Sequence, residues 1–164
     1  MEEVAKVVDV LDRGFGGDAW HGPSLRELLA DVTPRQAAAR PIAGAHSIWE
    51  IVLHLTAWKR EVAARMRGRP AGEPAEGDWP PAPRGADATP EAWAAAVDAL
   101  ARAHDDLVSA ARAVSSERLH APVADPRSPE LGAGVTHYVT LHGVAQHDAY
   151  HGGQIALLKK LPVA

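Results

Sequence analysis

The chain of 164 residues contains no cysteine. It therefore has no disulfide, no thiolate ligand for a metal ion and no cysteine nucleophile of its own. Any metal ion that it binds has to be held by nitrogen and oxygen atoms. Any thiol that takes part in a reaction has to come from outside the chain.

Long apolar runs and basic clusters are also missing. No stretch of 18 apolar residues occurs, and no basic N-terminal region leads into an apolar run, so we expect neither a membrane helix nor a signal peptide. The formal net charge is −4, and no Lys/Arg cluster is present that could displace counterions from nucleic acid. These absences predict a cytoplasmic protein that binds neither nucleic acid nor membrane.

Hydrophobic residues make up 46% of the chain, which is enough for a single domain over residues 1–164 to bury a core without cross-links. Apolar residues recur at helical spacing in four long segments, and no segment alternates as a strand does. The long helices are predicted at residues 2–15, 46–67, 90–114 and 135–160. The fold class is therefore all-α.

Shorter elements and two loops complete the predicted fold. Ser24 and Glu27 form a capping box that opens a short helix over residues 25–31, and Thr33 with Pro34 opens one or two further turns. Residues 69–90 contain six prolines and three glycines, so we expect a long crossover loop, held to the surface by Trp79, between two parallel helices. A second loop is expected at residues 120–134. The prediction is a four-helix bundle with short N-terminal helices.

Two histidines lie four residues apart in the last predicted helix. His147 and His151 project from one helix face, together with Val144 and Ile155, so both imidazoles are expected to point into the bundle. A buried imidazole has to be hydrogen-bonded, paired with a charge or bound to a metal. Two ligands are too few for a divalent ion, so a third is expected elsewhere in the chain.

His54 is the natural third ligand. It lies in the middle of the predicted helix at residues 46–67, on the face that carries Ile51 and Trp58, with Glu50 one turn before it. Three neutral histidines leave a divalent ion with an open coordination position, as in catalytic zinc sites.

The motif formed by His54 with its helix and by His147-Asp148-Ala149-Tyr150-His151-Gly152-Gly153-Gln154 resembles the DinB/YfiT-like family, which is unrelated to the DNA polymerase of similar name. The resemblance covers nearly the whole chain, including the segment from Trp20 to Pro23. It implies a four-helix bundle that often dimerises, with His54, His147 and His151 as metal ligands. Relatives with known activities transfer low-molecular-weight thiols, isomerise with a thiol cofactor or hydrolyse their substrates.

Four further residues have a functional and a structural interpretation. Glu50 is either a base that activates bound water, an acceptor for a ligand imidazole, or a solvated helix edge. His21 either lines the mouth of the site or is an exposed loop residue. His104 is either a fourth ligand, a neighbour of the ligands or a hydrogen-bonded core residue, and Gln154 either bonds a ligand ring or a water, or packs between helices.

The remaining aromatic residues are predicted to be structural. Trp49, Trp58 and Tyr150 are expected in the core or in a pocket wall. His46, His120, His137 and His142 are interpreted as surface or capping groups.

The sequence thus predicts a metal-dependent enzyme that acts on a small molecule, with zinc or nickel as the preferred ion and Glu50 or His21 as the group that assists proton movement. Transfer of an external low-molecular-weight thiol is the first reaction expected, and hydrolysis is the second. The alternative is a non-catalytic bundle in which the ion only ties two helices together. A homodimer is expected from the family resemblance.

Overall fold

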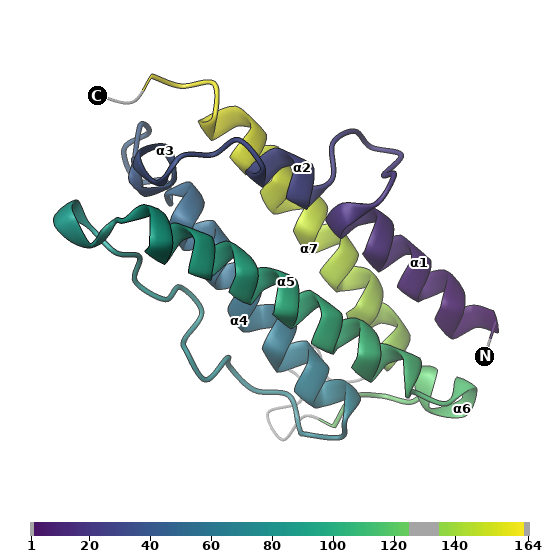
Figure 1. Cartoon of the computed structure of the whole chain (residues 1–164). Helices are drawn as coiled ribbons and strands as arrows, with labels where there is room; N and C mark the ends of the chain where they lie inside the picture. Colours follow the sequence, from purple (N-terminus) through teal and green to yellow (C-terminus); the bar gives the residue numbers. More distant parts are fainter. Residues whose placement is uncertain (1, 125–134, 163–164) are drawn as a thin grey trace.

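The computed structural model describes residues 2–124 and 135–162. These residues form seven α-helices and one short 3₁₀ helix (Figure 1). In chain order the elements are α1 (Glu2–Gly16), α2 (Leu25–Leu29), α3 (Pro34–Ala38), α4 (Ile48–Met66), η1 (Gly85–Asp87), α5 (Pro90–Arg112), α6 (Ser116–Leu119) and α7 (His137–Leu158).

The four long helices α1, α4, α5 and α7 contact one another in a ring. α4 packs on α5, α5 on α1, α1 on α7, and α7 on α4. Helices α4 and α5 run in one direction, whereas α1 and α7 run in the other (Figure 1). This arrangement confirms the predicted all-α four-helix bundle.

The crossover from α4 to α5 makes their parallel direction possible. α4 ends where Gly68 adopts a φ of +103°, and the chain then returns along the whole bundle before α5 begins (Figure 1). η1 is a short turn inside the segment that was predicted to be loop throughout. The loop predicted at residues 120–134 falls partly outside the described residues.

Side-chain caps define most helix starts, and the sequence predicted the caps of α2 and α3. Ser24 and Glu27 form the capping box of α2, and Thr33 caps α3 beside Pro34. The start of α4 was placed one or two residues too early, because Ser47 is its N-cap and Glu50 completes a capping box. Helix α6 was not predicted, although Ser115 accepts a hydrogen bond from the backbone of Arg118 as an N-cap does.

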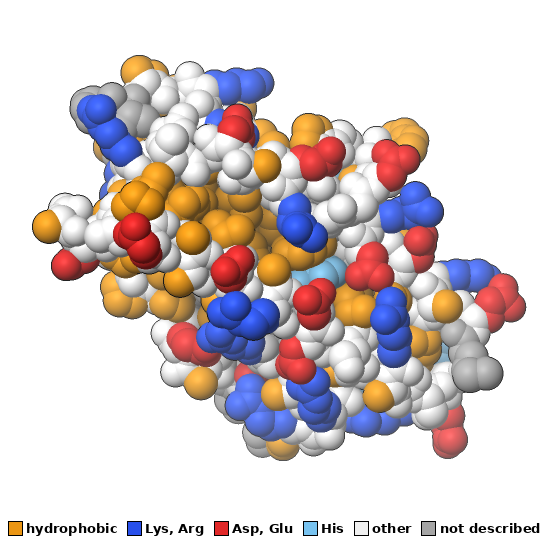
Figure 2. Space-filling view, in the orientation of Figure 1, with side chains coloured by type: hydrophobic (Ala, Val, Ile, Leu, Met, Phe, Trp, Pro, Cys, Tyr) orange, Lys and Arg blue, Asp and Glu red, His pale blue; other side chains and the backbone are white. Residues whose placement is uncertain are grey.

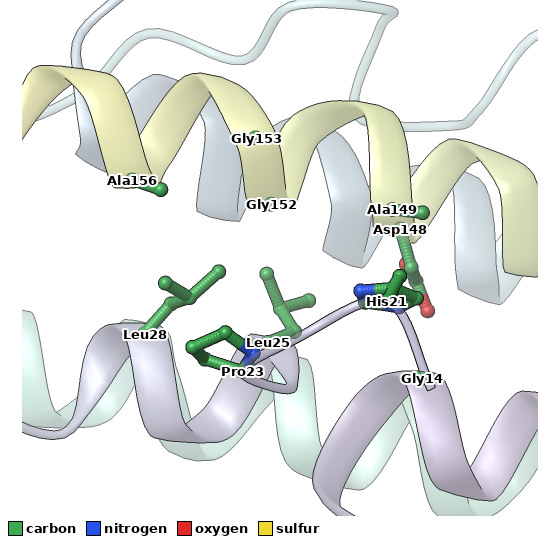
Figure 3. A pocket seen from close by; sticks show the side chains of 10 residues that line it. All are labelled: Gly14, His21, Pro23, Leu25, Leu28, Asp148, Ala149, Gly152, Gly153 and Ala156. Atoms are coloured by element: carbon green, nitrogen blue, oxygen red, sulfur yellow. The ribbon is translucent and has the colours of Figure 1, made fainter. Parts of the chain in front are cut away.

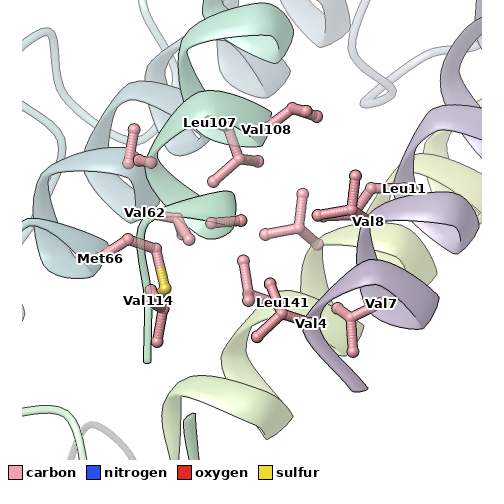
Figure 4. Packing of buried hydrophobic residues seen from close by; sticks show 14 of the residues in the cluster. Val4, Val7, Val8, Leu11, Val62, Met66, Leu107, Val108, Val114 and Leu141 are labelled. Carbon is pink, nitrogen blue, oxygen red and sulfur yellow. The ribbon is translucent and has the colours of Figure 1, made fainter. Parts of the chain in front are cut away.

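The apolar core has two clusters, one toward each end of the bundle. One contains Val8 and Leu11 of α1, Val62 of α4, Leu107 of α5 and Leu141 of α7 (Figure 4). The other joins α2 and α3 to the first half of α4 and the last turns of α7. Between the clusters, α4 and α7 carry buried polar side chains instead of apolar ones. The candidate site lies in this polar layer.

The surface shown in Figure 2 has no large area of one charge. Acidic and basic side chains alternate over α5 and its neighbours, and apolar atoms are exposed in a hollow between α5 and the short helices α2 and α3 (Figure 2). Among the helices of residues 2–124 and 135–162, none combines the length and the apolar character needed to cross a membrane.

Candidate metal centre

His54 of α4 meets His147 and His151 of α7 inside the bundle. The capping box at Ser47 sets the start of α4, and its buried face then carries His54 inward. His147 and His151 are one turn apart on α7, so both face α4. The three side chains form a group in which each offers one ligand atom and the three atoms lie within 4.8 Å of one another.

Their Nε2 atoms converge on one point. His147 Nε2 lies 2.9 Å from His54 Nε2 and 3.0 Å from His151 Nε2. His54 and His151 are 5% and 4% exposed, and His147 is partly buried. The structure therefore brings together all three histidines that were predicted to be ligands.

The outer ring nitrogens fix the orientation of two of these imidazoles. Nδ1–H of His54 donates to the backbone carbonyl of Asp78 over 2.6 Å, and Nδ1–H of His151 donates to Oε1 of Gln154 over 2.6 Å. Because Nδ1 carries the proton in both rings, the Nε2 atoms of His54 and His151 present lone pairs to the centre. Metal-ligating histidines are held by acceptors in this same way.

Burial keeps these three imidazoles uncharged. Desolvation, together with the neighbouring rings of His151 and His54, lowers the pKa of His147 to about 3. Desolvation also lowers the pKa of His54 and of His151, against the opposing influence of their hydrogen-bond acceptors. At neutral pH all three side chains are neutral, as a metal ligand has to be.

The donor set fits a divalent cation. Nε2 of His147 can carry one proton and donate it to only one of its two neighbours, so a proton cannot satisfy all three converging nitrogens. A single cation can satisfy them together. A tetrahedral ion with bonds of about 2.0–2.1 Å separates its nitrogen ligands by roughly 3.3 Å, close to the distances found here. Imidazole suits zinc and nickel alike.

The long crossover loop closes one side of the centre. Trp79 stacks on His54 with ring centroids 3.9 Å apart, and His46 stacks on the other face of Trp79 at 3.5 Å. Asp78 supplies the carbonyl to His54 and accepts a hydrogen bond from Trp58 Nε1 over 2.7 Å. Trp79 does hold the loop to the bundle, as predicted, and it does so directly on a candidate ligand.

Sequence reasoning missed two members of this arrangement. Asp78 acts through its backbone carbonyl, which leaves no signature in the residue type. His46 was interpreted as a surface or capping group, but its ring is part of a stack that leads to His54. The only available signal was the adjacency of Asp78 to Trp79 in a loop too long to be a simple connection.

A cavity of about 390 Å³ lies beside His151. His151 and Gln154 line it from α7, and His46 and Trp79 line it from the opposite side. Within the described residues, no fourth His, Asp or Glu joins the three-histidine group. Of the three histidines, only His151 lines the cavity.

Glu50 lies outside the three-histidine group and does not line this cavity. Its carboxylate accepts a hydrogen bond from the backbone N–H of Ser47 over 2.8 Å and pairs with Arg40. These hydrogen bonds and Arg40 hold the pKa of Glu50 below its usual value despite the opposing effect of burial. Nδ1 of His46 lies 3.8 Å from Oε2 of Glu50.

His21 lies on another side of α7. It is exposed and lines a separate cavity of about 250 Å³ between α7 and α2, with Asp148 at the same end (Figure 3). Leu25 and Leu28 line the other part of this cavity (Figure 3). His21 therefore does not line the cavity beside His151.

The other histidines have structural partners. His104 stacks on Phe15 with centroids 3.9 Å apart and bonds Asp12, which matches its interpretation as a hydrogen-bonded core residue. His137 was expected near the surface, but it is buried and donates from Nδ1 to the carbonyl of Ala121 over 2.8 Å. Of Glu50, His21, His104 and Gln154, only Gln154 hydrogen-bonds a histidine of the three-histidine group, namely His151.

Comparison with known proteins assigns the family. No curated protein and no solved structure matches the chain. The family model of the DinB superfamily matches residues 19–155, which is well over half of the chain and includes His54, His147 and His151. Together with the helical bundle and the three-histidine group, this match confirms the family resemblance that the motif predicted: the chain belongs to the DinB superfamily.

Proposed function

We propose that this protein is a divalent-metal-dependent enzyme that transfers a small external thiol to an electrophilic substrate, with His54, His147 and His151 holding zinc or nickel. The observation that supports the proposal is the convergence of three neutral Nε2 atoms, one of which belongs to His151, a residue that also lines a cavity. A bound ion with an open position lowers the pKa of a thiol or a water molecule, which makes a nucleophile near neutral pH.

The chain's own residues then orient and protect the centre. The carbonyl of Asp78 and the amide of Gln154 keep His54 and His151 in the tautomer that directs Nε2 inward. Trp79 covers His54 and excludes water from that side. Substrate can approach from the cavity that His151 lines.

Proton movement in this proposal is carried by His46. Thiol transfer forms a bond between sulfur and an electrophilic carbon, and it releases the thiol proton to a base. His46 lines the cavity and lies outside the three-histidine group. Glu50, predicted as a catalytic residue, acts here through His46, whose Nδ1 lies 3.8 Å from it. The role predicted for His21 stays a prediction.

The open cavity favours this proposal over a purely structural ion. A structural zinc site is closed by a fourth protein ligand, whereas a catalytic site keeps a position for water or substrate. Among the residues that the structure describes, the three-histidine group has no fourth member.

The test compares reactions with and without a small thiol, using metal-loaded protein and the His147→Ala variant. The electrophile is 1-chloro-2,4-dinitrobenzene: a carbon–sulfur bond replaces its carbon–chlorine bond, and chloride leaves. We expect the product to form faster only when thiol and metal are both present. A rate that needs metal but not thiol, measured on a panel of esters, supports hydrolysis instead. Equal rates for wild type and His147→Ala with all substrates support the scaffold alternative.

His46→Gln is the variant that tests proton movement. It should keep the metal content of wild type, because His46 is not in the three-histidine group, and lower kcat. General acid–base groups contribute about 10²–10⁴-fold to rate, so a loss of at least tenfold is expected. An unchanged kcat would remove His46 from the proposal without affecting the metal ligands.

A further inference from the structure

The lining of the cavity beside His151 is unusual for a pocket next to a candidate metal centre. None of its lining residues is Asp, Glu, Lys or Arg. Its walls are aliphatic and aromatic, with Ile51, Leu158 and Trp79 as the larger buried or partly buried members. The polar side chains that line it are two imidazoles, one amide and one phenol: His46, His151, Gln154 and Tyr150.

Exposed apolar side chains gather at this one cavity. Ile42, Tyr150 and Leu157 are 47%, 65% and 65% exposed, and all three line it. They are half of the six large hydrophobic side chains that are exposed over the described residues. Exposed apolar groups that surround a concave site mark a surface for apolar ligands.

Glu50, whose Oε2 lies 3.8 Å from Nδ1 of the lining residue His46, is already paired. Arg40 pairs with Glu50, whose carboxylate also caps α4 at Ser47. Neither Arg40 nor Glu50 lines the cavity. Away from the metal ion, a carboxylate, a phosphate or an ammonium group of a ligand would find no charged side chain in this lining and would be buried in an apolar setting, which is costly.

We propose that this cavity binds the substrate and that the substrate is a small, uncharged and mainly apolar molecule. The proposal rests on the proposed function in that it makes the cavity the substrate pocket of the metal centre. The volume of about 390 Å³ sets the size. A cavity of about 150 Å³ holds benzene, so this one has room for a molecule of two fused rings with a polar substituent directed at Gln154 or His46.

The test measures binding, and it does not depend on turnover. Three probes of equal size are compared by calorimetry at pH 7.5 in the presence of a chelator, so that no metal ion can hold the carboxylate: 2-naphthamide, which is neutral, 2-naphthoate, which is anionic, and 2-naphthylmethylamine, which is cationic. We expect 2-naphthamide to bind at least tenfold more tightly than either charged probe. Equal or tighter binding of a charged probe, or no binding of any of the three, overturns the proposal.

A matched pair of variants locates the binding site. Leu157→Lys adds an ammonium group to the lining close to the C-terminal end of α7, where a positive charge is compatible with the helix dipole. This variant should weaken the binding of 2-naphthamide at least tenfold. Val139→Lys makes the same change on the same helix at a residue that is 52% exposed and does not line the cavity, and it should leave binding unchanged. Equal effects of the two variants overturn the proposal.

Two further measurements distinguish a substrate pocket from a failure of the metal centre and from a dimer interface. His147→Ala removes a ligand of the metal but no residue of the cavity lining, so it should abolish metal-dependent activity and keep 2-naphthamide binding. If activity is present and the probe selectivity is absent, only the substrate class is wrong. If light scattering finds a dimer that Leu157→Lys but not Val139→Lys dissociates, and no probe binds, a second copy of the chain covers this cavity instead.

Discussion

Lys59 and Asp148 form an ion pair in the polar layer of the bundle, with 2.5 Å between Nζ and Oδ2 and exposed fractions of 1% and 2%. The pair links α4 to α7 immediately beside His147. The Phe15 ring lies 5.3 Å from the ammonium group. Because Asp148 follows His147 and Lys59 lies on the helix that carries His54, the pair sets how the two ligand-bearing helices face each other.

Breaking this pair from one side should be costly. Lys59→Met leaves the Asp148 carboxylate buried without its cation, and removal of one partner of a buried pair destabilises a protein by about 3–5 kcal/mol. Urea denaturation checks this value. The double variant Lys59→Met/Asp148→Leu should recover most of the loss, because neither charge then remains. A double variant less stable than Lys59→Met contradicts the explanation.

Metal content should depend on each of the three histidines. His54→Ala, His147→Ala and His151→Ala should each reduce bound metal sharply, measured by elemental analysis of protein purified without a histidine tag. His104→Ala is the control and should keep its metal, since His104 hydrogen-bonds Asp12 and stacks on Phe15 instead. Full occupancy in a His147→Ala/His151→Ala double variant would contradict the ligand assignment.

Removal of the metal should lower the melting temperature without unfolding the bundle. A ligand present at 1,000 times its Kd stabilises the folded state by about 4 kcal/mol, and a chelator removes that contribution. The two apolar clusters contain no candidate ligand, so helical content should persist. Circular dichroism with and without chelator measures both quantities. Loss of the helical signal at 25 °C after chelation would show that the core alone is insufficient.

Gln154 should tune metal affinity through His151. Its Oε1 accepts the Nδ1 proton, and loss of such an acceptor weakens metal binding by about 10–100-fold. Gln154→Ala should show this loss in a competition titration with a chromogenic chelator. Gln146→Ala, at an exposed residue of the same helix, serves as the control. Equal affinities of the two variants would assign Gln154 to helix packing.

Stability of the metal-free protein should fall as the pH falls below about 6.5. The folded-state pKa of His147 is about 3, and those of His54 and His151 are also lowered by burial, whereas an unfolded histidine titrates near 6.5. Below that value the unfolded chain binds more protons than the folded protein, so the free energy of unfolding decreases. The contribution is fully present above pH 6.5 and is lost progressively toward the folded-state pKa.

Urea unfolding between pH 6.5 and 5 checks this dependence, because most carboxylates remain ionised in that window. His147→Gln should flatten the slope, since it removes one of the three groups. Bound metal should raise the free energy of unfolding at each pH in this window. The three imidazoles bind protons only weakly in the folded state, so protons compete poorly with the metal. A free energy of unfolding that increases from pH 6.5 to 5 would contradict the direction of the pKa shifts.

The sequence by itself determined the local features of this protein. Helix caps at Ser24 and Thr33 and the 3.6-residue periodicity depend on residues close in the chain, so the helices and their inward faces could be predicted. His147 and His151 are one helical turn apart, so their shared face needed no tertiary information. His54 could be added because Ile51 and Trp58, its neighbours on the helix face, are apolar.

The tertiary structure decided what surrounds the three histidines. The carbonyl of Asp78 reaches His54 only because the crossover loop folds back along α4, and Trp79 enters between His46 and His54 for the same reason. The pairing of Lys59 with Asp148 spans 89 residues of sequence. Contacts of this kind depend on how helices and loops pack, and residue type within a single helix does not encode their partners.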